Sequence, residues 1–179
     1  MQGQGIRASD WIVREEKAAD RDGIRDVHQL AFGQAAEADL VDALRDGGHS
    51  RLSLVAEMDG SVAGHVLLSA LSIVSGSGAV PALALAPLAV LPRLHRRGIG
   101  SDLVRRCLDL ARERGHRIVI VVGSPRFYGR FGFSAPLALP LESAYAGEAF
   151  QAAALAPGAL DGVSGRVEYA PPFEPFRSL

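Results

Sequence analysis

The sequence predicts one mixed α/β domain built around a central sheet, and three observations lead to this prediction. The chain has 179 residues, 48% of them hydrophobic and 22% charged, which suits a single domain with a full-sized core. An apolar run at residues 82–91, an amphipathic stretch after Gly98 and a second apolar run at residues 117–122 follow one another as strand, helix and strand. Upstream, Asp59-Gly60 joins two strand-like runs as a hairpin signal. Parallel and antiparallel pairs are therefore expected in the same sheet.

The first third of the chain predicts a strand and two helices. The segment "WIVREE" at residues 11–16 is typical of a strand. Asp20 is placed to cap a helix that runs to about Phe32, and a second helix over residues 35–45 is expected to end at Gly47-Gly48. Residues 1–10 lack the apolar core of a signal peptide, and we expect them to form a flexible N-terminus.

The middle of the chain predicts the strands of the central sheet. Residues 53–74 form the two runs that meet at Asp59-Gly60, and "SGSG" at residues 75–78 predicts a loop. Residues 82–91 are too apolar for a half-exposed strand, so we place them in the middle of the sheet. Pro87 interrupts this run, and because proline cannot donate a ladder hydrogen bond it indicates a bulge or an edge.

After the central strand the pattern changes to a helix period. The predicted inward face consists of Leu103, Val104, Cys107, Leu108 and Ala111. Gly115 ends this helix, residues 117–122 form the next strand, and "SPRFYGRFGF" at residues 124–133 predicts a short helix with Ser124 as N-cap. Phe127, Phe131 and Phe133 are expected in the core. Beyond Ala135, strand-like pieces lie around residues 137–141, 149–155 and 165–169.

Composition excludes several classes of protein. A formal net charge of -1 does not favour electrostatic binding to nucleic acid, and none is expected. Cys107 is the one cysteine, which excludes an internal disulfide and multi-cysteine zinc sites, and no histidine spacing suggests a metal. Because Pro87 breaks the longest apolar stretch, we expect no membrane span and a cytoplasmic protein.

The segment "LHRRGIG" predicts an anion-binding site. A helix N-terminus offers unpaired N–H groups and the positive end of the helix dipole, and Gly98 and Gly100 let the backbone approach a ligand closely. Neighbouring basic residues add positive potential: Arg93, His95, Arg96 and Arg97. No lysine follows as in a Walker loop, and Leu103 stands where a dinucleotide fingerprint requires its third glycine. An ordinary helix start with turn glycines is the alternative interpretation of this segment.

Two motifs together resemble the GNAT N-acetyltransferase superfamily, whose members bind acetyl-coenzyme A. "HRRGIG" is similar to its Gln/Arg-x-x-Gly-x-Gly/Ala signature, with His95 in place of glutamine or arginine. In "FYGRFGF", Tyr128 lies four residues before Gly-Phe, as in the family's later motif. With "PLAVLP" and "GHVLLS", the chain resembles the predicted-acetyltransferase branch typified by the bacterial YhbS proteins. The resemblance covers residues 12–135 and implies the GNAT acyl-CoA N-acyltransferase fold, a central mixed sheet flanked by helices.

The resemblance implies how acetyl-CoA, the co-substrate, is held. Its pyrophosphate would lie on the helix start, and its pantetheine arm would pair with strand backbone near Pro87. The residues implied in cofactor binding are Leu88, Ala89, Val90, His95, Arg96, Arg97, Gly98, Ile99, Gly100, Ser101 and Ser124. Tyr128 would donate a proton to the departing thiolate during direct transfer to an amine of a small molecule or peptide. An aromatic residue that closes the short helix onto the sheet is the alternative role for Tyr128.

The general base is the least determined part of the predicted site. Many relatives carry a glutamate on the central strand, but residues 82–91 contain no carboxylate. Glu37, Glu57 and His65 are the candidates, and a water chain is the alternative. Each of two candidates also has a purely structural interpretation. Glu37 would lie on a solvated helix face, and His65 would be a sheet residue whose hydrogen bonds are satisfied.

The domain organisation expected from the resemblance is one GNAT domain at residues 11–145 and a C-terminal extension at residues 146–179 packed on it. The extension can complete an acceptor pocket or form a homodimer contact, and the sequence leaves both open. Two rival functions also remain: a nucleotide-dependent transferase, and a non-catalytic acyl-CoA-binding or sensor module.

Overall fold

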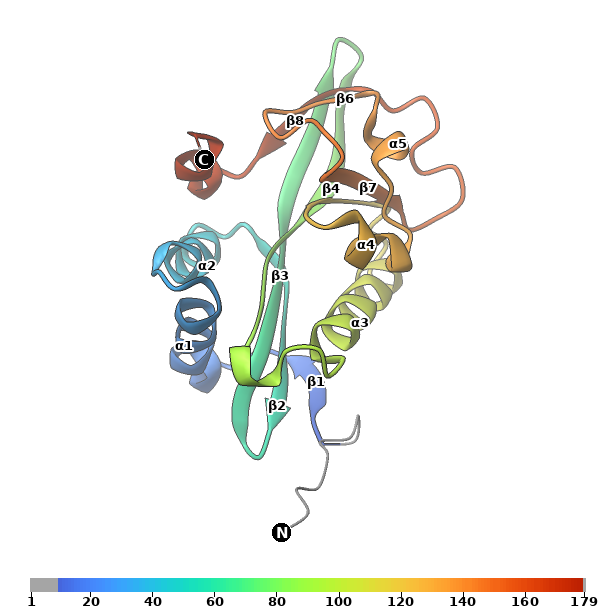
Figure 1. The fold of residues 1–179 in the computed structure, drawn as a ribbon. Helices are drawn as coiled ribbons and strands as arrows, with labels where there is room; N and C mark the ends of the chain where they lie inside the picture. Colours follow the sequence, from blue (N-terminus) through green and yellow to red (C-terminus); the bar gives the residue numbers. More distant parts are fainter. Residues whose placement is uncertain (1–9, 179) are drawn as a thin grey trace.

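Two long strands, β3 (Ser61–Ser75) and β4 (Gly78–Val90), form the middle of an eight-stranded sheet in the computed structural model, which describes residues 10–178 (Figure 1). The strand order is β1-β2-β3-β4-β5-β7. The outer strands are β1 (Ile12–Glu15), β2 (Ser50–Met58), β5 (Ile118–Val122) and β7 (Phe150–Ala154). Residues 1–9, which make up most of the expected flexible N-terminus, lie outside the described residues.

The C-terminal part of the chain extends this same sheet. β8 (Gly165–Tyr169) pairs with β3 from Leu71 to Val74, just beyond the β3 residues that pair with β2, and β6 (Leu141–Glu142) pairs with β8. A final 3-10 helix, η4 (Pro171–Ser178), lies near α2 (Figure 1). Strands from both the predicted domain and the predicted extension therefore share one sheet.

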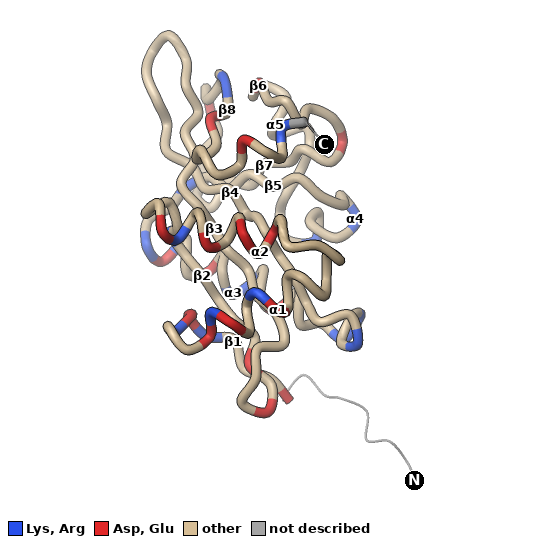
Figure 2. The backbone as a smooth tube through the Cα atoms, turned by 90° about the vertical axis from the view of Figure 1, so that its left-hand side faces the viewer, with Lys and Arg blue, Asp and Glu red and all other residues tan. Residues whose placement is uncertain are grey.

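Helices cover both faces of the sheet. α3 (Ile99–Glu113) packs on one face, and α1 (Arg21–Phe32) and α2 (Ala36–Asp46) pack on the other (Figure 1). Each face of the sheet therefore has its own hydrophobic core, and successive side chains of β2 point to opposite faces. Leu54 belongs to the core between the sheet and α3, and Val55 belongs to the core between the sheet and α1 and α2. The five predicted inward residues of the α3 helix are all buried. Acidic and basic residues are intermixed over the face formed by α1 and α2 (Figure 2).

The sheet is mixed, as predicted. β4 pairs antiparallel with β3 and parallel with β5, and α3 provides the crossover between the two parallel strands. Between the pairs Val66–Leu88 and Leu68–Leu85, β3 has one residue and β4 has two, Ala86 and Pro87. The bulge predicted at Pro87 is therefore confirmed.

Two local predictions are wrong, and a third is confirmed in position. Asp20 precedes α1, but its carboxylate accepts hydrogen bonds from the Lys17 N–H (2.6 Å) and from Arg14 (2.7 Å) instead of capping that helix, which follows a 3-10 turn η1 (Ala18–Asp20). Ser124 is the N-cap residue of α4 (Pro125–Tyr128), as predicted, and its side chain makes no cap hydrogen bond. Residues 137–141, expected as a strand, fall mostly in α5 (Ala135–Ala138) and the turn after it, where Pro136 favours a helix start.

Candidate active site

The candidate site begins where β4 and β5 separate. Within residues 10–178 their pairing consists of Leu83 with Val119 and Ala84 with Ile120. Past the bulge, Leu88 to Val90 pair with β3 along one edge, and their other edge faces the opening that β5 leaves. Unpaired backbone N–H and C=O groups are obligatory hydrogen-bonding groups, so this edge can receive an extended ligand.

A groove of about 660 Å³ runs from this edge to the start of α3. It is lined by Leu88, Val90, Leu94, His95, Arg96, Gly98, Ile99, Gly100, Ser101, Ser124, Phe127, Tyr128 and Arg130. Nine of the eleven residues predicted to bind the cofactor are among them. The other two are Ala89, which is buried and pairs with β3, and Arg97, which is exposed.

Glycine conformation shapes the groove at the start of α3. Gly98, the N-cap, has φ 98°, which lies in the left-handed region that favours glycine. A Cβ at Gly100 would lie 3.7 Å from both Phe127 and Val90, side chains that line the groove. The first N–H groups of α3 have no acceptor within the helix, so they can bind an anion here.

His95, which departs from the family signature, contacts the strand edge. Its Nε2 lies 2.8 Å from the Val90 carbonyl oxygen, and since a carbonyl can only accept, the imidazole donates. This hydrogen bond satisfies one backbone group at the end of β4. His95 thereby links the strand edge to the turn that precedes α3.

Arg130 lines the groove and was missed from the sequence. Its guanidinium donates to Ser101 Oγ at 3.2 Å and lies over the rings of Phe127 (5.0 Å) and Phe131 (5.3 Å). These contacts fix a cation beside the first turn of α3. Of the three phenylalanines predicted in the core, Phe133 is buried, whereas Phe127, which lines the groove, and Phe131 are half-buried. Arg130 follows Tyr128 by two residues, and that spacing was the available signal.

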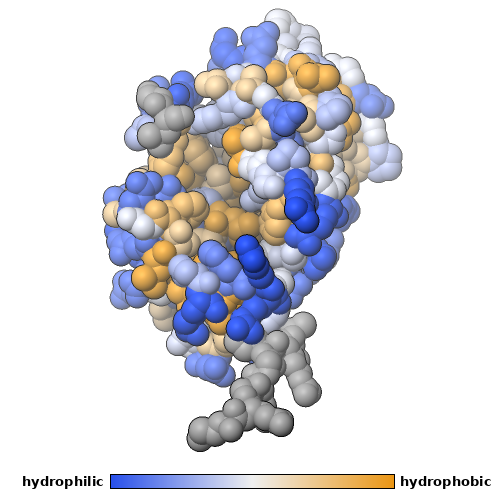
Figure 3. Space-filling view, in the orientation of Figure 1, coloured by the Kyte–Doolittle hydropathy of each residue, from blue (hydrophilic) through white to orange (hydrophobic). Residues whose placement is uncertain are grey.

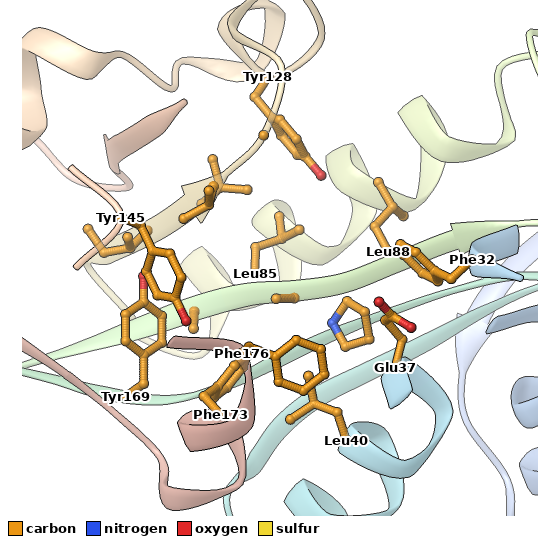
Figure 4. A pocket seen from close by; sticks show the side chains of 17 residues that line it. Phe32, Glu37, Leu40, Leu85, Leu88, Tyr128, Tyr145, Tyr169, Phe173 and Phe176 are labelled. Carbon is orange, nitrogen blue, oxygen red and sulfur yellow. The ribbon is translucent and has the colours of Figure 1, made fainter. Parts of the chain in front are cut away.

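A second cavity, of about 390 Å³, lies on the other side of Tyr128 (Figure 4). It is lined by Phe32, Glu37, Leu40, residues 84–88, residues 120–123, Tyr128, Tyr145, Tyr169, Phe173 and Phe176. Leu88 and Tyr128 line both the groove and this cavity, so the two spaces meet there. Figure 3 shows a hollow in the middle of this face with hydrophobic residues on its walls.

Tyr128 is held at this junction by its ring. It packs edge-to-face against Phe127 (4.8 Å) and Phe133 (5.7 Å), and its hydroxyl points into the cavity (Figure 4). A Cβ on Gly123 would lie 2.9 Å from Tyr128 Cδ2 and closer still to Cε2, so the ring occupies the space above that glycine. Burial raises the pKa of Tyr128 to about 12, which keeps the phenol protonated at neutral pH.

Two of the three candidates for the general base, Glu37 and His65, lie in different places. Glu37 lines the second cavity, and Gln34 Nε2 donates to both of its carboxylate oxygens at 3.0 and 3.2 Å. His65 is fully buried and lines neither space, so the satisfied sheet position describes it better. Glu57, also considered, pairs with Arg14 at 2.7 Å on the β1–β2 side of the sheet.

His65 belongs to a buried polar network under α1. Its Nδ1 lies 2.8 Å from His28 Nε2, and its Nε2 lies 2.8 Å from Ser53 Oγ, which also hydrogen-bonds Glu16. Burial lowers the pKa of His28 to about 3. Burial alone would raise the pKa of Glu16, but the nearby His65 ring and the contacts with Arg45 and Ser53 outweigh it and lower that pKa to about 2. The network is a structural element of the α1 face.

Comparison with known proteins identifies the family. Residues 12–135 match the family described as "Acetyltransferase (GNAT) domain". The Escherichia coli K12 protein "Uncharacterized N-acetyltransferase YhbS" is 36% identical over 168 residues, 92% of this chain and 99% of its own length. The chain belongs to the GNAT acetyltransferase family.

Solved structures of GNAT proteins share its fold. The structure of E. coli YhbS in complex with CoA superposes with a TM-score of 0.85 and 35% identity, over 97% of this chain and 95% of that one. A GNAT family acetyltransferase from Brucella melitensis, solved with acetyl-CoA, has a TM-score of 0.77 and 34% identity, over 92% and 98%. Resemblance to the YhbS branch, predicted from "PLAVLP", "GHVLLS" and "FYGRFGF", is therefore confirmed.

Three further observations concern the chain outside the groove. In the described part of the chain, no three His, Cys, Asp or Glu residues come close enough together to hold a metal ion. None of the helices in residues 10–178 is long and apolar enough to span a membrane. Cys107 is fully buried in α3, where burial raises the pKa of its thiol.

Proposed function

We propose that this chain transfers an acetyl group from acetyl-CoA directly to a primary amine. The observation that carries the proposal is the meeting of the groove and the second cavity at Tyr128 and Leu88. The groove has an anion-binding helix start at one end and an open strand edge at the other, which suits the pyrophosphate and pantetheine of CoA. The acceptor would enter from the opposite cavity, so the thioester and the amine would meet beside the Tyr128 hydroxyl.

The step balances with groups that line the two spaces. The amine nitrogen attacks the thioester carbonyl carbon, the C–S bond breaks, and the thiolate takes the phenolic proton of Tyr128. Glu37, directly or through water, would accept the proton that the new amide nitrogen loses. Burial keeps the Tyr128 phenol protonated at neutral pH, which is the form that can donate a proton to the departing thiolate.

The test of the mechanism is Tyr128→Phe, which removes the hydroxyl and retains the packed ring. Affinity for acetyl-CoA should stay within about threefold, while kcat and kcat/KM fall together by about 10²–10⁴, the usual range for a lost general acid. Turnover is measured by thiol release with a panel of amines. A wild-type rate in Tyr128→Phe with chemistry rate-limiting would remove the acid role.

A non-catalytic acyl-CoA-binding or sensor module is the second candidate, because no carboxylate lies on β4. The other rival, a nucleotide-dependent transferase, is not supported, because the chain belongs to the GNAT family and lacks a Walker lysine. A thermal-shift panel of acetyl-CoA, CoA, ATP and NAD separates them, since a ligand at 100 times its Kd stabilises by about 2.7 kcal/mol. Stabilisation by the two CoA species with turnover of an amine supports an enzyme, and stabilisation without turnover of any amine supports the binding module.

A further inference from the structure

The second cavity has a composition that selects among amines. Its walls carry six aromatic rings from separate parts of the chain: Phe32 of α1, Tyr128 of α4, Tyr145, Tyr169 of β8, and Phe173 and Phe176 of η4 (Figure 4). Aliphatic residues of α2 and β4 complete the surface, among them Leu40, Leu85 and Leu88. A space of about 390 Å³ with such walls favours an apolar group over a hydrated one.

Glu37 is the one charged residue among the described residues that line this cavity. Its carboxylate projects among the rings, on the same side as Leu88 and Phe32 (Figure 4). Gln34 orients it by donating to both oxygens. A carboxylate in an apolar cavity attracts an ammonium and opposes a second carboxylate. Arg166 and Arg177 do not line this cavity. They line a separate groove, which shares Tyr145 and Tyr169 with it.

We propose that the acceptor is a primary amine carried on an apolar, ring-sized group and lacking a carboxylate beside the amine, with Glu37 receiving its ammonium. This inference rests on the proposed function, because it names the substrate class of the same site. The rings hold the apolar group, and Glu37 brings the nitrogen to the side of the cavity that Leu88 and Tyr128 share with the groove. The bound ammonium releases one proton to solvent before the neutral amine attacks, and Glu37 accepts the second proton when the amide forms.

Three amines test the proposal on the whole protein with saturating acetyl-CoA: 2-phenylethylamine, ethylamine and phenylalanine. Burial of a phenyl group is worth roughly 10- to 100-fold, so kcat/KM for 2-phenylethylamine should exceed that for ethylamine by about this factor. It should also exceed that for phenylalanine by at least about tenfold, the effect of one unpaired carboxylate near another. Equal values for 2-phenylethylamine and either comparison amine would overturn the proposal.

Two variants assign the selectivity to residues. Phe176→Ala should lower the ratio of 2-phenylethylamine to ethylamine, and Glu37→Gln should lower the ratio of 2-phenylethylamine to phenylalanine. Each ratio is measured within one variant, so losses of folding or of a base affect both amines and cancel. Glu113→Gln, on the exposed side of α3, is the matched charge control and should leave both ratios unchanged. Ratios unchanged in the first two variants would contradict the assignment.

Failure of this inference and failure of the proposed function give different results. If acetyl-CoA binds and other amines are acetylated but 2-phenylethylamine is not preferred, the function stands and the substrate class is wrong. If no amine turns over, binding of 2-phenylethylamine to the CoA-saturated protein is measured by calorimetry. Binding that Phe176→Ala weakens at least about threefold supports the cavity's specificity without catalysis, and absence of binding overturns it.

Discussion

Replacement of Gly123 by alanine should disable Tyr128 without changing any group that takes part in the chemistry. Gly123 directly follows β5, and its missing side chain leaves the space that the Tyr128 ring fills. The backbone there is tied down, because the Gly123 N–H donates to the Ala149 carbonyl (2.9 Å) and the buried Gln151 side chain donates to the Gly123 carbonyl (3.1 Å). The added methyl group therefore moves the ring and leaves the strand in place.

The size of the effect follows from the geometry. A Cβ at 2.9 Å from Cδ2, and closer still to Cε2, must retreat to an ordinary carbon contact of about 3.5–4.0 Å, so the ring shifts by at least about 1 Å. A displacement of that size at a reacting group can lower the rate about 10²-fold. We expect kcat for Gly123→Ala to fall by about that factor while the affinity for acetyl-CoA changes by less than about fivefold.

Gly129→Ala is the matched control, because Gly129 follows Tyr128 directly and an added Cβ meets nothing within 4 Å. It should retain wild-type kcat in the same thiol-release assay. The double variant Gly123→Ala/Tyr128→Phe should be no slower than Tyr128→Phe, since both changes remove the same proton donor. Wild-type kcat in Gly123→Ala, or additive losses in the double variant, would refute the reasoning.

Three further predictions concern the cofactor groove, the core and pH. Gly100→Val should weaken acetyl-CoA binding at least about tenfold in calorimetric titration, because a side chain enters the groove. Arg97→Ala should weaken the same binding less than about threefold, because exposed charge is screened. Equal losses of affinity in the two variants would indicate a charge-driven site. Cys107→Ala should keep activity and lose about 1 kcal/mol of unfolding free energy in urea, and thiol reagents should label the native protein slowly; rapid labelling with inactivation would suggest an acyl-enzyme. The pKa of His28 is about 3 in the folded protein and near 6.5 when unfolded, so the unfolded state binds more protons between these values. The contribution of His28 to the free energy of unfolding should therefore be fully present above pH 6.5 and should fall below that pH by up to about 1.4 kcal/mol per pH unit. In His28→Gln the free energy of unfolding should fall less steeply. Equal unfolding free energies at pH 7.5 and pH 5 would contradict this prediction.

Local patterns in the sequence predicted the parts of the site that depend on local structure. The α3 start, the Pro87 bulge and the short helix that carries Tyr128 each follow from neighbours within a few positions: a glycine pair, a missing donor, a proline at a helix start. The change of the hydrophobic period from strand to helix and back to strand was sufficient to predict that β4 and β5 pair in parallel. Backbone conformation is largely a short-range property, and these predictions used nothing else.

The second cavity, by contrast, was decided by tertiary structure. Its rings come from α1, α4, the turn at Tyr145, β8 and η4, and the pairing of β8 with β3 just beyond the end of β2 brings the rings of β8 and η4 to the cavity. Nothing in the local pattern of residues 165–178 specifies that pairing, since register between distant strands depends on which buried faces match. The same non-local packing buried His65, left Glu37 in the cavity and set the Tyr128 ring over Gly123. The sequence alone thus determined the glycine-containing start of α3, and only the packing of distant segments determined the cavity that lies opposite it.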